Sequence, residues 1–99
     1  MPPTVFSADG SYEWDAAKDW ANRRDHRGVT FAEAATALES PGVQVSDDGS
    51  GSGPLRGIGY SFKGRLLTVI LEERGSRDRI ISAWPSTRAE RRLFMARGV

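Results

Sequence analysis

The chain has 99 residues, of which 38% are apolar and 27% are charged, with a formal net charge of +1. This length suits one domain with a modest core, and the composition argues against intrinsic disorder. The chain has no Cys and a single His, which excludes disulfide scaffolds, thiol nucleophiles and thiolate zinc sites. Because no apolar run approaches membrane-spanning length, we expect a cytoplasmic protein with no membrane partner.

The first elements follow a segment rich in Pro and Gly. Residues 1–10 are expected to form a loose N-terminal arm, and residues 11–97 one domain that begins with a short extended piece. Asp15 can cap a helix that ends near Gly28, where a glycine favours termination. Its apolar stripe has helical spacing and comprises Ala16, Ala17, Trp20 and Ala21.

Two further helices are predicted from capping boxes. The first box, Thr30 to Glu33, opens a helix whose apolar residues continue to Leu38. The second box, Thr87 to Glu90, opens a C-terminal helix after the strand-ending Pro85. The two N-terminal helices and this last one flank the segment in which the strands are expected.

The middle of the chain alternates in the manner of strands. Strands are predicted near residues 43–45, 58–62, 65–71 and 79–84. The expected fold class is therefore α+β: two N-terminal helices, an antiparallel sheet of three or four strands and a C-terminal helix. Gly57, Gly59 and Ser61 leave one strand face bare, which suits either a docking partner or a helix of the same chain.

The charge is distributed unevenly along the chain. Residues 1–54 carry four basic and nine acidic side chains, whereas residues 55–99 carry ten basic and four acidic ones. A basic half suggests a surface for a polyanion such as nucleic acid. A solvated, salt-bridged face with no ligand is the alternative, and the charge alone does not separate the two.

Two groups of side chains are candidates for chemistry. His26 lies four residues after Asn22 on one helix face, where an imidazole can act as a general acid or base or simply cap the helix. The second group is the arginines near the last strands and helix, which can stabilise a phosphodiester transition state without a metal. The alternative for Arg74 and Arg79 is that they pair with Glu72, Glu73 or Asp78 across the hairpin and only brace the turn. The three Trp are expected in the core rather than as base-stacking platforms.

A series of short motifs follows in order along the chain: Tyr12-Glu13-Trp14-Asp15, Asn22, His26, Gly28-Val29-Thr30-Phe31, Arg56, Gly64-Arg65-Leu66-Leu67, Glu73-Arg74-Gly75, Arg79-Ile80-Ile81-Ser82-Ala83 and Thr87-Arg88 with Glu90-Arg91-Arg92. Taken together and in this order, these motifs resemble those of the BrnT family of toxins. The resemblance implies a RelE-like fold and a ribonuclease that arrests translation. It also implies neutralisation by a BrnA-type antitoxin whose ribbon-helix-helix region binds operator DNA for the complex.

The matched positions, together with phosphate chemistry, give a set of expected site residues. The expected catalytic residues are His26, Glu73, Arg74, Arg79 and Arg88. The expected RNA-binding residues are Arg56, Arg65, Arg91 and Arg92. No cofactor and no metal are expected. Asp25, Leu55 and Trp84 stand where the family pattern has other residues, so the alternative is a module that binds nucleic acid or antitoxin without cleaving RNA.

Overall fold

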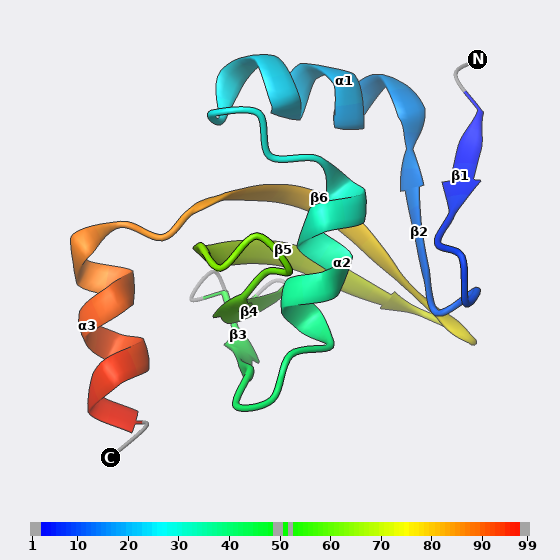
Figure 1. The fold of residues 1–99 in the computed structure, drawn as a ribbon. Helices are drawn as coiled ribbons and strands as arrows, with labels where there is room; N and C mark the ends of the chain where they lie inside the picture. Colours follow the sequence, from blue (N-terminus) through cyan, green and yellow to red (C-terminus); the bar gives the residue numbers. More distant parts are fainter. Residues whose placement is uncertain (1–2, 49–50, 52, 98–99) are drawn as a thin grey trace.

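The computed structural model describes residues 3–48, 51 and 53–97, which form one mixed sheet and three helices (Figure 1). In chain order the elements are β1 (Thr4–Phe6), β2 (Tyr12–Asp15), α1 (Ala16–Asp25), α2 (Phe31–Leu38), β3 (Gln44–Asp47), β4 (Leu55–Tyr60), β5 (Leu66–Arg74), β6 (Arg77–Pro85) and α3 (Arg88–Arg97). The predicted α+β class and all three predicted helices are confirmed.

The sheet is larger than the sequence indicated. Its six strands run in the order β1-β2-β6-β5-β4-β3, and β2 pairs with β6 in parallel while the other neighbours are antiparallel. The prediction of three or four antiparallel strands was therefore wrong, and the first two helices follow two strands rather than opening the fold. The additional strands come from the segment before α1.

The expected loose arm contains a strand. Thr4–Phe6 pairs with β2, and Ser7 and Asp9 hold the turn between them because the Asp9 carboxylate accepts from the Ser7 hydroxyl and the Ser11 backbone N–H. Two residues of this arm, Met1 and Pro2, lie outside the described part of the chain. Three residues that follow a proline are too few to show a strand pattern, so the pairing came only with the tertiary fold.

Helix α2 covers one face of the sheet at close range. A Cβ at Gly59 would lie 2.5 Å from the Ala37 carbonyl oxygen, and one at Gly57 would lie 2.5 Å from a Leu38 methyl group. Of the two alternatives for the bare strip of β4, the structure shows the helix of the same chain, so this strip is not open to a docking partner. The core between α2 and the sheet includes Phe31 and Val69, both with no exposed surface.

Helix α1 turns a different face to the core from the one predicted. Trp20 is 65% exposed, whereas Asn22 is 5% exposed. The predicted apolar stripe is corrected here, because the helix is anchored by hydrogen bonds of Asn22 rather than by the Trp20 ring. Of the three Trp, only Trp14 is buried in the core.

Helix α3 stands to one side of the sheet, joined to β6 by a short connection (Figure 1). It contacts the outer part of the sheet through Phe94, whose ring lies edge-on to Tyr60 with centroids 5.6 Å apart. Gln44 adds a hydrogen bond from its side-chain amide to the Phe94 carbonyl. These few contacts leave Leu93 and Met95 about half exposed.

Candidate functional site

A hollow of about 660 Å³ lies where α1 ends and where β6 leads into α3. Its lining residues are Asp25, His26, Arg27, Trp84, Pro85, Ser86 and Thr87. His26 is the C-cap of α1, and its ring lies 6.0 Å from the Trp84 ring, tilted by 46°. The single imidazole of the chain and a half-buried indole thus share one hollow.

The side chain of Asn22 fixes α1 against the outer edge of β6. Its amide donates to the carbonyls of Val29 and Ala83, at 3.0 and 2.8 Å, and its oxygen accepts from the Ala83 N–H at 3.1 Å. This side chain takes the place of a neighbouring strand at Ala83, since β2 pairs with β6 only near Arg79. Asn22 is therefore a structural residue that sets the position of His26.

Arg27 is held in an uncommon backbone conformation beside His26. Its φ is +53°, in the left-handed region that residues other than Gly rarely adopt. The Arg65 side chain donates to the Arg27 carbonyl at 3.1 Å, which secures this turn. The Arg27 side chain is exposed, so its charge is available at the rim of the hollow.

Glu90 organises the opposite wall of the hollow. Its Oε1 accepts hydrogen bonds from the Trp84 indole N–H (3.0 Å), the Thr68 hydroxyl (3.0 Å) and the Thr87 backbone N–H (2.8 Å). Burial alone would raise its pKa, but these hydrogen bonds together hold the pKa of Glu90 below its ordinary value. The capping box predicted at Thr87 to Glu90 is confirmed. The hydrogen bond from Trp84 to Glu90 is not part of that motif and could not be predicted from it.

The five expected catalytic residues do not form one cluster. Strand β6 has nine residues, so at about 3.3 Å per residue its two ends lie about 26 Å apart. Glu73 and Arg74 lie at the end of β5 beside the start of β6, while His26 and Arg88 lie near its other end. One phosphodiester cannot contact both groups.

Two of the expected catalytic arginines at the hairpin end, Arg74 and Arg79, are paired with carboxylates. Arg74 binds Glu72 at 2.9 Å, and Arg79 binds Glu13 on β2 at 2.6 Å. Arg74 thus has one of the partners named in the alternative, Glu72. Arg79 is also paired, but with Glu13 on β2 rather than with an acid of the hairpin.

The expected RNA-binding residues also differ in their surroundings. Arg65 forms two hydrogen bonds with the buried carboxylate of Glu33, at 2.8 and 2.6 Å, and the Ser61 hydroxyl binds the same carboxylate at 2.7 Å. The Arg65 hydrogen bonds are the main reason that the pKa of Glu33 lies below its ordinary value. Arg91 and Arg92 are instead exposed on α3.

Arg56 faces the side of the sheet that carries α3. It is half-buried on β4 beside a small hollow of about 140 Å³ that Gln44 and Leu93 also line. Its Nε is buried and has no hydrogen-bond partner among the described residues. Arg56 is thus separate from the hollow at His26.

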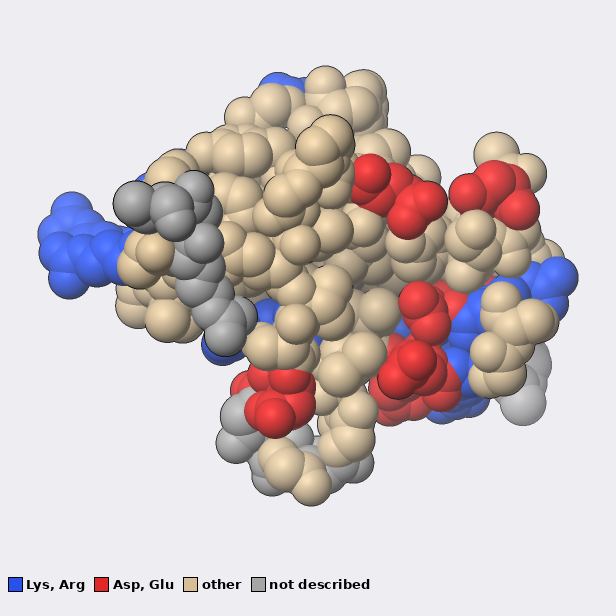
Figure 2. All heavy atoms as spheres, turned by 90° about the horizontal axis from the view of Figure 1, so that it is seen from below, with Lys and Arg blue, Asp and Glu red and all other residues tan. Residues whose placement is uncertain are grey.

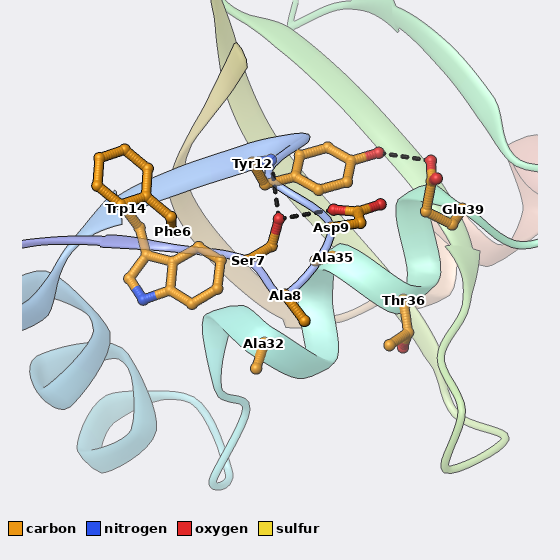
Figure 3. Close-up of a pocket in the computed structure, with 10 residues that line it drawn as sticks. All are labelled: Phe6, Ser7, Ala8, Asp9, Tyr12, Trp14, Ala32, Ala35, Thr36 and Glu39. Atoms are coloured by element: carbon orange, nitrogen blue, oxygen red, sulfur yellow. Dashed lines mark hydrogen bonds between the residues drawn. The ribbon is translucent and has the colours of Figure 1, made fainter.

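A second hollow, of about 470 Å³, lies between the β1–β2 turn and α2 (Figure 3). Its walls are mostly apolar, including Ala8 and Ala35, and the Tyr12 hydroxyl donates to the Glu39 carboxylate at 2.7 Å at one end. Burial, together with Glu39, raises the pKa of Tyr12 far above its ordinary value. The nearby Asp9 adds a second carboxylate, so this hollow is unfavourable for a polyanion.

Many of the acidic side chains visible in Figure 2 lie at its right, on the side of the β1–β2 and β5–β6 hairpins, with Lys and Arg among them, and a smaller acidic group lies at the lower left of centre. Burial, with repulsion from Glu73 and Glu39, raises the pKa of Asp78 on the side of the hairpins. The described ranges contain no group of three or more His, Asp or Glu side chains placed to hold a metal ion. No helix among the described residues is long and apolar enough to cross a membrane.

Two comparisons with known proteins give a match, one to a family model and one to a solved structure. The family model for the ribonuclease toxin BrnT of type II toxin–antitoxin systems matches residues 14–90. Among solved structures, the chain is similar to the ribonuclease toxin BrnT of Brucella abortus, with a TM-score of 0.60 and 23% identity, over 76% of this chain and 94% of that one. No curated protein sequence matches the chain.

Proposed function

The chain belongs to the BrnT family of ribonuclease toxins of type II toxin–antitoxin systems, and we propose that it is an endoribonuclease that cleaves RNA in the hollow beside His26. The observation that carries the proposal is the position of His26, which lines a hollow with Arg27 and Trp84. The hollow offers an imidazole, a side chain that can accept or donate a proton, beside cationic and aromatic side chains.

The proposed reaction uses the RNA itself as the nucleophile. The 2′-hydroxyl attacks the neighbouring phosphorus while its proton passes to a base, and the 5′-oxygen leaves with a proton from an acid. His26 serves in one of these proton transfers. Arg27 lines the hollow and Arg88 is the first residue of α3. Their positive charges stabilise the additional negative charge on the phosphate oxygens in the transition state. The products are a 2′,3′-cyclic phosphate and a 5′-hydroxyl, and no metal is required.

The RNA chain beyond the cleavage site is proposed to run along α3. Arg88, Arg91 and Arg92 are exposed on this helix and form no ion pair among the described residues. Guanidinium groups bind phosphate in a bidentate manner, so these three are suited to a nucleic-acid backbone. Arg65 and Arg79 take no part in this proposal because both are committed to carboxylates within the protein.

A type II toxin has an antitoxin partner, and we propose that it is of the BrnA type with a ribbon-helix-helix region. In this proposal operator DNA is bound only through the antitoxin, and both proteins act in the cytoplasm. Acidic side chains of the antitoxin would meet the same cations of α3 that hold RNA. Antitoxin and RNA are then expected to compete for the toxin.

The proposal is tested by cleavage of a defined RNA in the presence of EDTA. We expect cleavage to persist and the products to carry 2′,3′-cyclic phosphate and 5′-hydroxyl ends. A requirement for added magnesium would contradict the mechanism. Binding without any cleavage would instead support the alternative of a non-catalytic module.

A further inference from the structure

We propose that Trp84 is a stacking platform for one unpaired nucleobase of the RNA next to the cleaved bond. This inference rests on the proposed function, which places RNA in the hollow. It adds which part of the RNA the hollow recognises. Bases of a single strand expose their faces, whereas those of a duplex do not. The ligand is therefore a single-stranded nucleotide segment.

The three Trp of the chain differ in what their rings can reach. Trp14 is 4% exposed and packs edge-on against Phe31. Trp20 is 65% exposed on α1, and the Arg23 guanidinium covers its ring at 5.1 Å. Trp84 is half-buried, and it is the Trp that lines the hollow with His26. An indole that is partly anchored and partly open to a hollow has the geometry for stacking.

The plane of the Trp84 ring is fixed by a hydrogen bond at its edge. The indole N–H donates to Glu90 Oε1 at 3.0 Å, and that oxygen is itself held by Thr68 and Thr87. Because the ring cannot rotate without breaking this bond, its face is oriented before a ligand arrives. Preorganisation of this kind reduces the entropy that binding would otherwise cost.

The neighbours of Trp84 suit a nucleotide rather than an apolar peptide. His26 lies against the indole at 6.0 Å, and the hydroxyls of Ser86 and Thr87 line the same hollow. The Asp25 carboxylate in the lining is paired with Arg24 at 3.1 Å, so its charge is offset. A base on Trp84 would bring its own ribose and phosphate to the side of His26, where the proposed reaction takes place.

The test uses a short RNA oligonucleotide with 2′-O-methyl groups, which removes the attacking hydroxyl and prevents cleavage. The protein carries Trp20→Phe, so that of its remaining indoles Trp14 is buried and Trp84 faces the hollow. We expect binding to quench the tryptophan fluorescence. An abasic site at one position of the oligonucleotide should weaken binding by about tenfold and abolish the quenching, as loss of one stacked base does.

Two substitutions at Trp84 make the test specific. Trp84→Phe keeps an aromatic face and should retain sensitivity to the abasic site, whereas Trp84→Leu should bind about tenfold more weakly and lose that sensitivity. Wild-type cleavage of unmodified RNA is measured in parallel. Equal binding of abasic and intact oligonucleotides at every position, with cleavage intact, overturns the stacking inference alone. Stacking without cleavage supports the inference and contradicts the proposed function.

Discussion

Arg65 has a guanidinium that could reach an RNA strand, yet it is bound inside the protein. Its partner Glu33 is 1% exposed and depends on Arg65 and Ser61 for its hydrogen bonds. A buried carboxylate that loses its cation is costly, because its charge is left uncompensated. The ion pair with Glu33 therefore gives Arg65 a structural role instead of a role in RNA binding.

We expect Arg65→Met to destabilise the protein by about 3 kcal/mol, at the lower end for broken buried pairs, because the Arg65 side chain is 31% exposed. The matched control is Lys63→Met, since Lys63 approaches the same carboxylate at 4.0 Å and is 52% exposed. This control should cost less than about 1 kcal/mol. Urea unfolding measures both. A stable Arg65→Met variant with weakened RNA binding would show that Arg65 contacts RNA instead.

At the scale of elements, the contact between α2 and β4 depends on two glycines with different neighbours. A Cβ at Gly59 would meet the Ala37 backbone carbonyl, whereas one at Gly57 would meet the end of the Leu38 side chain. A side-chain end can move, but a helix backbone moves only with the helix. The two positions therefore form an internal comparison.

We expect Gly59→Ala to lower the free energy of unfolding by about 2 kcal/mol or more, in the range for overpacked cores. Gly57→Ala should cost clearly less, because Leu38 can change its side-chain conformation. Thermal unfolding of the two variants side by side measures the difference. If both variants were as stable as the wild-type protein, α2 would not pack on β4 at this distance.

How far the sequence predicts an element depends on how local its determinants are. The Thr30 hydroxyl caps α2 by accepting from the Glu33 backbone N–H, and Thr87 and Glu90 cap α3 reciprocally. These contacts lie within one helical turn, so α2 and α3 could be predicted, although the Glu33 carboxylate binds Arg65 and Ser61 instead of completing the first box. Strand β1 and the parallel pairing of β2 with β6 depend on residues far apart in the chain, so local patterns did not reveal them. The helical spacing of its apolar neighbours predicts that Trp20 is buried, but the long-range hydrogen bond of Asn22 to Ala83 turns the face with Asn22 toward the core instead.

The candidate site could be predicted in part for the same reason. His26 stands out as the single imidazole of the chain, but its neighbour Trp84 is 58 positions away in the sequence and joins it only in the fold. Glu73, Arg74 and Arg79 were grouped with His26 because their positions match one family pattern. The length of β6 separates them in space.

For the whole molecule, the carboxylates give stability a defined dependence on pH. The pKa values of Glu33 and Glu90 are lowered in the folded state, from an ordinary value of 4.5. Their contribution is therefore complete above about pH 4.5 and is lost as the pH falls through the folded-state values. The pKa of Asp78 is raised from 3.8, so its ionisation opposes folding as the pH rises through its folded-state value.

Urea unfolding between pH 3 and pH 8 measures this balance. We expect stability to fall below about pH 4.5, and Glu33→Gln to flatten that fall because its carboxylate no longer titrates. Asp78→Asn is expected to stabilise the protein at pH 7 and to have no such effect at pH 3. If the stability of Glu33→Gln fell at low pH as steeply as that of the wild-type protein, the assigned contribution of the Glu33 carboxylate would be contradicted.

The two ends of β6 make the central claim directly testable. The measurement is single-turnover cleavage of one defined RNA in EDTA by the wild-type protein, His26→Gln and Glu73→Gln, each first shown to be folded. The account predicts that His26→Gln lowers the rate by about 100-fold or more, as loss of a general acid or base does, while Glu73→Gln cleaves at nearly the wild-type rate. Full activity in His26→Gln would contradict the account, and loss of activity in Glu73→Gln would place the reaction at the hairpin end instead.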